Sequence, residues 1–264
     1  MRRLAIGVAA VLVAAPAAAQ QRDYCPERPG LDTPACIVDR GRVSVETSVI
    51  DWTLDRQPDS RTDTITIGET LVRVGVSDRM ELRASWEPFG HERVRDTASG
   101  AIDRADRVGD AVIGLKASLL NPDGDGFSVA LLPSVSLPVG REPIGAGGFG
   151  YNLLVPVSYD LSETVQLDAT PSLRTLPDEG GSGHHLRYGS AGGVTVKMSK
   201  AVSLGAEAQV VRDDEPGDHT TRARTALSIA WQPQDDWQLD LFGIAGLNRD
   251  TPDLEVSAGI ARRF

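Results

Sequence analysis

The chain has 264 residues, with 27 lysines and arginines against 37 aspartates and glutamates, which gives a formal net charge of −10 at pH 7. Binding to a nucleic-acid backbone requires a clustered basic surface, and the sequence contains no basic run. Charge therefore argues against a nucleic-acid partner. The apolar fraction of 41% excludes neither a soluble protein nor a membrane barrel, because a barrel turns only alternate residues to lipid.

The first residues have the layout of a cleaved secretory signal peptide, which we assign to residues 1–19. A short basic start precedes an apolar run that ends in three alanines. The apolar run from Leu4 to Ala19 is shorter than the about 20 residues of a transmembrane helix, and Pro16 interrupts it. The sequence thus predicts an exported protein that can span a membrane only as a closed barrel of strands.

Two cysteines, Cys25 and Cys36, follow the predicted signal peptide. An even, closely spaced pair in an exported chain predicts a disulfide. No further cysteine or histidine lies near them, so we predict no metal site there. We assign residues 20–41 to a periplasmic N-terminal segment that carries this disulfide loop.

From residue 42 onward, apolar and polar residues alternate in segments of strand length, without helical periodicity. The predicted fold is all-β: a closed, antiparallel, up-and-down transmembrane β-barrel over residues 42–264 with about twelve strands. The predicted strands cover residues 42–54, 62–76, 80–87, 107–120, 127–139, 148–161, 164–175, 185–198, 201–212, 221–232, 236–247 and 253–264.

The connections alternate between short turns and longer charged or glycine-rich stretches. Outer-membrane barrels show this asymmetry, with tight periplasmic turns and longer external loops. We predict external loops at residues 88–106 and 140–147, among others, and expect these two to tune selectivity should they fold inward. An even strand number places both ends of the chain on the periplasmic side.

The polar positions between the apolar ones face the lumen if the strands form a barrel. A soluble sandwich remains the alternative, because alternation is the same when two apolar faces meet in a core. Trp86, Trp231, Trp237, Tyr188 and Phe264 fall on the apolar faces near strand ends, as interfacial aromatics do, whereas Phe242 falls inside. The predicted lumen-lining residues are Glu69, Arg73, Glu81, Arg83, Lys116, Asp168, Arg174, Arg187, Glu207, Arg224, Asp240 and Glu255.

The last segment, Leu254 to Phe264, alternates strictly and ends on an aromatic residue. It resembles the terminal strand signal of bacterial outer-membrane barrels, to which Gly259 and Phe264 correspond. That resemblance implies that this strand closes the barrel and is recognised by the barrel-assembly machinery. Arg262 departs from the pattern, which usually has an apolar residue two places before the end.

Most of the mature chain resembles the family of outer-membrane barrel transporters of the meta-pathway of phenol degradation. The resemblance rests on three segments, Leu71–Arg83, Val108–Lys116 and Leu132–Gly140. It implies a barrel and a transport role in a Gram-negative bacterium. It does not establish phenol as the solute.

The four histidines, His91, His184, His185 and His219, map to predicted external loops. Ser182 lies close to His184 and His185, but a catalytic triad is recognised by held geometry rather than by proximity in sequence. Adjacent imidazoles on a loop also lack the further ligands of a structural metal site. We therefore predict no enzyme, no catalytic residues, no metal and no cofactor.

The leading hypothesis is a porin-like pore or transporter in the outer membrane that passes small molecules, aromatic or hydrophobic ones among them, between outside and periplasm. Its predicted partners are outer-membrane lipid and a small-molecule solute. The alternatives are a structural or adhesive outer-membrane barrel with an occluded lumen and a soluble periplasmic β-sandwich. Convergence of Glu69, Arg73, Glu81 and Arg83 in space would favour the occluded barrel.

Overall fold

The structure is a computed structural model that describes residues 21–179 and 183–264. The predicted signal peptide and Ser182 lie outside the described residues. Within the described ranges, no helix is long and apolar enough to cross a membrane.

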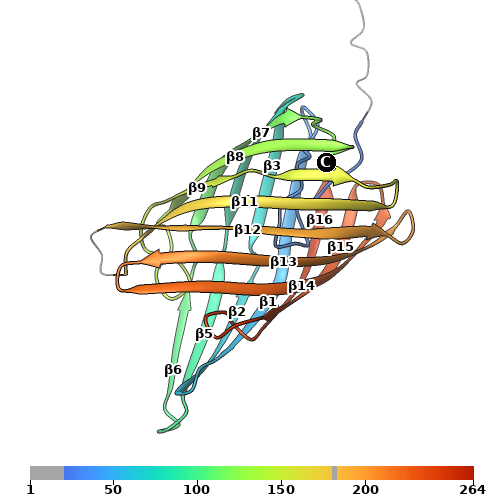
Figure 1. The fold of residues 1–264 in the computed structure, drawn as a ribbon. Helices are drawn as coiled ribbons and strands as arrows, with labels where there is room; N and C mark the ends of the chain where they lie inside the picture. The colour runs from blue at the N-terminus through green and yellow to red at the C-terminus, as the bar shows by residue number, and fades with distance from the viewer. Residues whose placement is uncertain (1–20, 180–182) are drawn as a thin grey trace, which may run out of the picture.

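The described residues form sixteen strand segments in one antiparallel sheet that curls into a barrel (Figure 1). The segments are β1 (Val43–Arg56), β2 (Ser60–Ile67), β3 (Thr70–Ser77), β4 (Met80–Trp86), β5 (Phe89–Asp96), β6 (Ile102–Arg107), β7 (Ala111–Leu120), β8 (Phe127–Leu137), β9 (Gly150–Leu154), β10 (Val157–Asp160), β11 (Val165–Pro177), β12 (His184–Lys197), β13 (Val202–Glu215), β14 (Asp218–Gln234), β15 (Trp237–Gly246) and β16 (Leu254–Arg263).

Four pairs of segments are halves of single strands, so the barrel has twelve strands, as predicted. β1, for example, pairs with β3 along its first half and with β2 along its second half. The interruptions fall at Gly68–Glu69, Glu87–Pro88, residues 108–110 and Val155–Pro156. Proline cannot donate to the ladder, and Gly68 has a φ of +80°, so these residues break the pairing locally without ending the strand.

The barrel closes where β1 and β16 pair, from Ser44 opposite Arg263 to Leu54 opposite Leu254. At the rim, the Phe264 N–H donates to the Val43 carbonyl at 2.8 Å, and the Val43 N–H donates to the Phe264 carbonyl at 3.2 Å. First and last strands therefore satisfy each other, as a membrane barrel requires. The alternative of a soluble sandwich is wrong.

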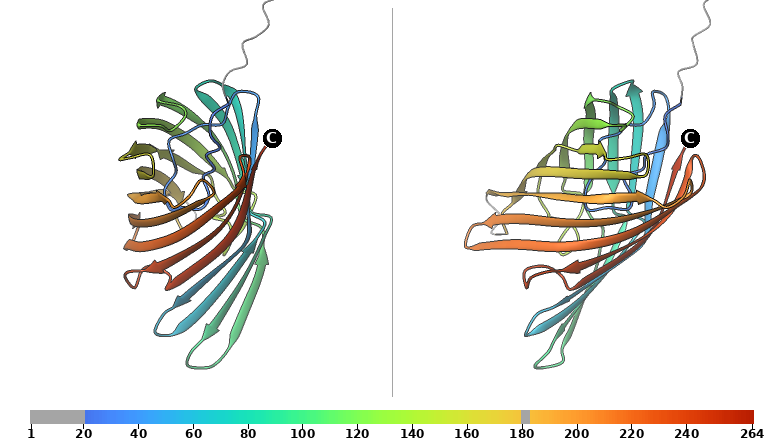
Figure 2. Two further views of the ribbon diagram at one scale, coloured as in Figure 1. Left: turned by 90° about the vertical axis from the view of Figure 1, so that its right-hand side faces the viewer. Right: turned by 45° about the vertical axis from the view of Figure 1, so that its right-hand side comes forward.

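The stretch 88–106, predicted as an external loop, is instead mostly strand. β5 and β6 form a hairpin that continues the barrel wall well beyond its neighbours at the end away from the termini (Figures 1 and 2). Among the described strands, β6 pairs only with β5. A hairpin that projects past the lipid has no apolar face, so its charged sequence lacks the alternation on which the prediction depended.

The second predicted loop, residues 140–147, folds inward. The Asp110 carboxylate accepts the backbone N–H groups of Gly140 at 2.9 Å and Ala146 at 2.8 Å. These bonds bring the Ile144 side chain against Gly90, where a β-carbon would lie 2.7 Å from it. Gly90 pairs with Thr66, whose hydroxyl reaches the lumenal Asp51, so Ile144 packs against the inner face.

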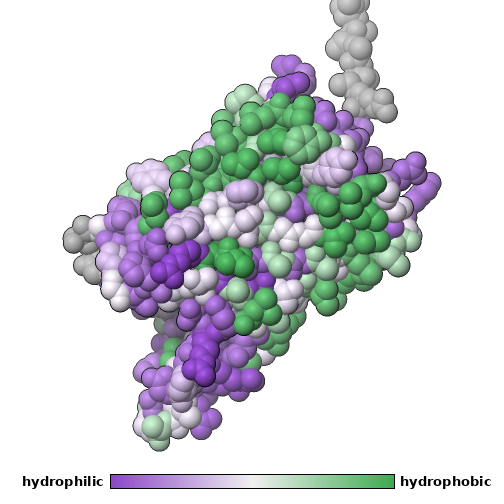
Figure 3. Space-filling model, viewed as in Figure 1, coloured by the Kyte–Doolittle hydropathy of each residue, from purple (hydrophilic) through white to green (hydrophobic). Residues whose placement is uncertain are grey.

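The outer face carries a broad surface of apolar side chains. Leu227 is 70% exposed and Leu161 57%, and aromatic rings such as Trp86, Tyr188 and Trp231 are also exposed. Figure 3 shows patches of hydrophobic residues, in green, over the barrel wall and hydrophilic residues, in purple, towards the end of the projecting hairpin. Exposed apolar surface on this scale indicates contact with lipid.

Arg262, which departs from the terminal strand signal, stacks on two of the interfacial aromatics. Its guanidinium lies 4.5 Å from the ring centroids of both Trp237 and Phe264. A cation over an aromatic face is attracted by the ring quadrupole. The rings thus accommodate a charge on the outward face near the rim.

Candidate functional site: a plugged lumen

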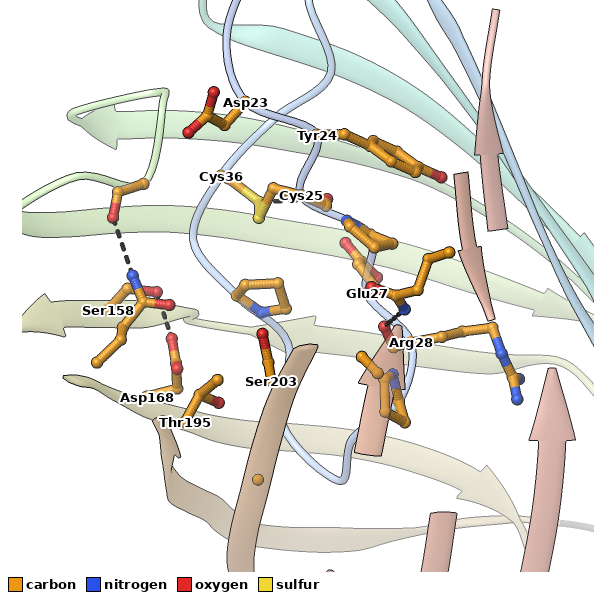
Figure 4. A pocket seen from close by; sticks show the side chains of 18 of the residues that line it. Asp23, Tyr24, Cys25, Glu27, Arg28, Cys36, Ser158, Asp168, Thr195 and Ser203 are labelled. Carbon is orange, nitrogen blue, oxygen red and sulfur yellow. Dashed lines mark hydrogen bonds between the residues drawn. A yellow bond between two sulfur atoms is a disulfide. The ribbon is translucent and has the colours of Figure 1, made fainter. Parts of the chain in front are cut away.

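The N-terminal segment, residues 21–41, lies inside the barrel, and we call it the plug (Figures 2 and 4). Tyr24 and the run from Ala35 to Val38 are buried there. The segment predicted to be periplasmic, residues 20–41, thus corresponds in the structure to a coil seated in the lumen over residues 21–41. Cys25 and Cys36 form the predicted disulfide, with their Cα atoms 6.4 Å apart, which closes the tip of the plug into a loop.

Carboxylates of the wall hold the backbone of the plug. Glu46 accepts the N–H groups of Glu27 and Arg28 at 2.8 and 3.1 Å, and Glu207 accepts those of Leu31 and Asp32 at 2.6 and 3.0 Å. Elsewhere along the plug, wall residues Glu81, Thr170 and Ser158 accept further N–H groups. A coil without secondary structure needs such partners, because its buried N–H groups have no strand to pair with.

Cations of the wall bind the plug's carbonyl groups and its acid. Arg73 donates to the Cys25 carbonyl at 2.9 Å, and Lys116 donates to the Pro34 carbonyl at 2.6 Å. Lys116 also lies 2.9 Å from the Glu27 carboxylate, which pairs with Arg83 as well. Burial alone would raise the pKa of Glu27, but Arg83, Lys116 and Arg73 hold that pKa below its ordinary value.

The centre of this ion-pair cluster is fully buried. Arg73 and Lys116 are 0% exposed, and Arg73 also pairs with Glu46 at 3.0 Å and Glu81 at 2.9 Å. Removing one partner from such a cluster leaves an uncompensated buried charge, which is strongly destabilising. The plug is therefore bound by a constellation that is complete only when Glu27 is in place.

Asp32, near the tip of the plug, has the opposite environment. Burial first, and then the charges of Glu207 and Asp168, raise the pKa of Asp32 to about 8. Asp168 is itself oriented by the Ser158 hydroxyl at 2.5 Å (Figure 4). Asp32 consequently carries a proton at neutral pH while the plug is seated.

Cavities lie on both sides of the plug. One of about 200 Å³ lies towards the termini, and one of about 290 Å³ lies on the other side; Glu27, Arg28 and Pro29 line both. The second adjoins a third cavity of about 170 Å³, with which it shares Arg174, Gln209, Arg224 and Glu255. The plug thus divides the lumen into two compartments.

The third cavity is rich in arginine. Arg174, Arg187, Arg222 and Arg224 line it, with Glu255 as the only acid among the lining residues. Arg224 pairs with Glu255 and Arg187 with Asp213, whereas neither Arg174 nor Arg222 has an ion pair among the described residues. Arg174 and Arg187 lie directly opposite each other on neighbouring strands, and two like charges in such a pair repel each other.

Every predicted lumen-lining residue except Glu69 either contacts the plug or lines one of the cavities. Arg73, Glu81, Arg83, Lys116 and Glu207 contact the plug, and Asp240 pairs with Arg28. Glu69 is exposed, without an ion pair among the described residues. The remaining predicted residues line the cavities: Asp168, Arg174, Arg187, Arg224 and Glu255.

The sequence did not predict a lumenal role for the plug residues Glu27, Arg28 and Asp32. A coil has no periodicity that assigns its side chains to a face, so alternation could not find them. The charged wall positions at one level of the barrel, Arg73, Glu81 and Lys116, were the available signal. Buried charges in such number require a partner of some kind.

A closed twelve-strand barrel with an apolar outer face and a polar, plugged interior defines an outer-membrane β-barrel. The chain belongs to the family described as "Putative MetA-pathway of phenol degradation", whose model matches residues 27–264. The match begins at Glu27 and so includes most of the plug.

Solved structures of outer-membrane barrels share the fold. An outer membrane channel from Pseudomonas putida F1, of the group COG4313, aligns with a TM-score of 0.70 and 14% identity over 89% of this chain and 99% of that one. The NanC porin aligns with a TM-score of 0.51 and 8% identity over 83% and 98%. The translocator domain of the autotransporter NalP from Neisseria meningitidis aligns with 0.57 and 16% over 84% and 88%. A comparison with curated protein sequences found no match.

Proposed function

We propose that this barrel is an outer-membrane channel selective for small organic anions. The observation that carries the proposal is the arginine cavity, in which Arg174 and Arg222 face lumenal space without an acidic partner among the described residues. Arginine side chains that line a pore attract and bind anions, and a guanidinium matches a carboxylate in two parallel hydrogen bonds.

The family description supports an aromatic solute within that class. Phenolates and aromatic acids combine a negative charge with a ring, and the arginine side can accommodate both features. Phe242 brings an aromatic ring to the inner face, where it lines the same cavity as Arg174 and Arg224. Stacking of a ring on a guanidinium would add to the charge attraction.

The plug makes passage conditional. With Glu27 seated, the lumen is narrowed between two cavities, and a solute that reaches the arginines must pass the plug to continue. Conduction therefore requires that the plug be displaced. The charged wall residues that hold the seated plug are then exposed to water, which satisfies them in place of the plug backbone.

The test is single-channel recording in planar bilayers under a KCl gradient, with the reversal potential as the readout. Arg174→Gln and Arg222→Gln, alone and together, should shift the reversal potential away from anion selectivity. Arg212→Gln is the matched control, because Arg212 lies on the outward face opposite Tyr188 and pairs with Asp214. A cation-selective wild-type channel, or an equal shift in the control, would contradict the proposal.

A second candidate, an occluded structural barrel, has an observation in its favour. Arg73, Arg83 and Glu81 converge as that hypothesis requires, although Glu69 does not join them. Its prediction is distinct: well-folded protein shows no conductance even when Glu27 is replaced. Conductance that appears on unseating the plug would exclude it.

Several proteins with a similar fold are described as channels or porins, which supports a role without catalysis for this chain.

We further propose that β16, which completes the barrel and ends at Phe264, is the strand by which the barrel-assembly machinery recognises the chain. Phe264→Ala should then lower the yield of assembled barrel in the outer membrane. Heat-modifiable gel mobility measures that yield.

A further inference from the structure

A separate cluster of ionisable side chains lies on the inner wall at the end of the barrel away from the termini. Asp178 follows β11, His185 lies at the start of β12 and Glu215 ends β13. Arg187 and Asp213, two positions further along the same strands, are register partners and bond each other on the lumenal face. Asp178 and Glu215, which come from two neighbouring hairpins, thus meet at the imidazole of His185.

The imidazole of His185 faces two carboxylates with the same nitrogen. His185 is 8% exposed, and its Nδ1 lies 3.1 Å from Asp178 Oδ1 and 2.6 Å from Glu215 Oε2. A single N–H cannot donate well to both acids, and only the contact with Asp178 has hydrogen-bond geometry. The three atoms lie within 4.8 Å of one another, close enough to share one ion.

The other ring nitrogen of His185, Nε2, faces the carboxylate of Asp213, which Arg187 binds through its second oxygen. Nε2 lies 3.0 Å from Asp213 Oδ1, and Arg187 Nε donates to the second oxygen, Oδ2, at 2.8 Å. Oδ1 is buried and has no partner in hydrogen-bond geometry within the described structure. A histidine that ligates a metal through one nitrogen typically donates the other N–H to such a carboxylate, which fixes the ring and raises its basicity.

We propose that Asp178, His185 and Glu215 bind a divalent transition-metal ion, with Zn²⁺ as the representative. One imidazole nitrogen and two carboxylate oxygens are a donor set that suits this class, and water completes the coordination. Ligands at about 2.0–2.2 Å from a tetrahedral zinc lie about 3.3 Å apart. The observed separations of 2.6 and 3.1 Å from Nδ1 approach that value, so small side-chain rotations suffice.

The competing account is a protonated imidazole that pairs with the surrounding acids. It explains the short contacts equally well, but it predicts no saturable metal binding. Direct measurement of metal binding separates the two accounts.

The experiment is calorimetric titration of the full, detergent-folded chain, stripped with a chelator, with ZnCl₂. We expect one equivalent of Zn²⁺ to bind. His185→Ala should abolish that binding, and Glu215→Gln should weaken it by at least about tenfold, in line with the loss of a ligand. Asp213→Asn should weaken it by about tenfold while the stoichiometry stays at one, because Asp213 positions the ring without touching the ion.

His184→Ala is the matched control. His184 precedes His185 on β12 but is exposed and faces the other way, where its Nε2 lies 3.0 Å from the Phe149 carbonyl. Zinc binding should be unchanged in this variant. Heat-modifiable gel mobility reports whether each variant is folded, and Glu215→Gln decides the matter if His185→Ala does not fold.

Absence of saturable Zn²⁺ binding to the wild-type chain overturns the assignment. So does a loss of affinity in His184→Ala that equals the loss in His185→Ala or Glu215→Gln. Neither outcome bears on the channel proposal, because Arg174 and Arg222 are absent from the metal cluster. The two proposals therefore fail separately.

Discussion

The two sides of the plug differ in charge. Towards the termini, the cavity is lined by acids, among them Asp23, Asp123, Asp125 and Asp168, with few cations. On the other side, the adjoining cavity carries four arginines and one glutamate. The arginine side attracts anions and the acidic side repels them, because each field acts locally where water is confined. The plug stands at the boundary between these two fields.

The largest expected effect on gating comes from a substitution that releases the plug from its seat. Glu27→Ala leaves Arg73, Arg83 and Lys116 without the plug's acid, which costs about 3–5 kcal/mol for a buried pair. We expect the plug to leave its seat and the open probability of the channel to rise by about tenfold or more, since that energy exceeds the 1.4 kcal/mol of a tenfold change in an equilibrium.

Asp23→Ala is the control for this experiment, because Asp23 belongs to the plug but is exposed and has no ion pair among the described residues. Its open probability should match that of the wild type. Unchanged open probability in a folded Glu27→Ala barrel would show that the ion-pair cluster does not hold the plug.

A smaller effect is expected at Gly259. A β-carbon there would lie 2.2 Å from the Arg28 guanidinium, which donates to Asp240 at 3.1 Å and Ser257 at 3.0 Å. Gly259→Ala should therefore displace Arg28 and increase the frequency of channel opening severalfold. Gly243→Ala, on the neighbouring strand β15 with nothing within 4 Å of the new carbon, should leave gating unchanged.

Asp32 makes the plug sensitive to pH. Its pKa of about 8 when seated lies above the ordinary value of 3.8, so the seated state binds the proton more tightly than the released state. The resulting stabilisation is complete below the ordinary pKa and is lost as pH rises through about 8. Open probability should rise between pH 6 and pH 9, and Asp32→Asn should remove that dependence. A pH profile identical in wild type and variant would exclude Asp32 as the titrating group.

The smallest effect concerns the outer face, away from both cavities. Arg262→Ala removes a cation from two aromatic rings and should lower barrel stability by about 0.5–1 kcal/mol. Urea-induced unfolding followed by tryptophan fluorescence measures the change. Arg262→Lys, which keeps the charge above the rings, should recover part of the loss. Channel selectivity should be the same in all three proteins.

The barrel could be predicted from sequence because lipid and water impose a period of two on every strand that crosses the membrane. Twelve strands, their closure through β1 and β16, and the lumenal side chains Arg73, Lys116 and Asp240 all follow from that period. The projecting hairpin β5–β6 escaped, because beyond the bilayer both of its faces meet water and the period disappears.

The contents of the lumen could not be predicted in the same way. Glu27 and Asp32 lie on a coil whose contacts depend on where the chain re-enters the barrel, and no local pattern encodes that path. The cluster around His185 needs the registers of β11, β12 and β13 before Asp178 and Glu215 come together. Alternation tells which side chains point inward, but only the three-dimensional structure tells which of them meet.

The two legs of the plug leave the barrel through the same rim. The Arg42 guanidinium donates to the Gln21 side-chain oxygen at 3.0 Å, and Gln21 also reaches Asp236 in the turn before β15. The intervening residues therefore enter and leave the lumen at the same rim, and the plug does not run from one end of the barrel to the other. The plug can therefore leave the lumen through this rim and return by the same route, and no part of the chain has to pass through the other end of the barrel.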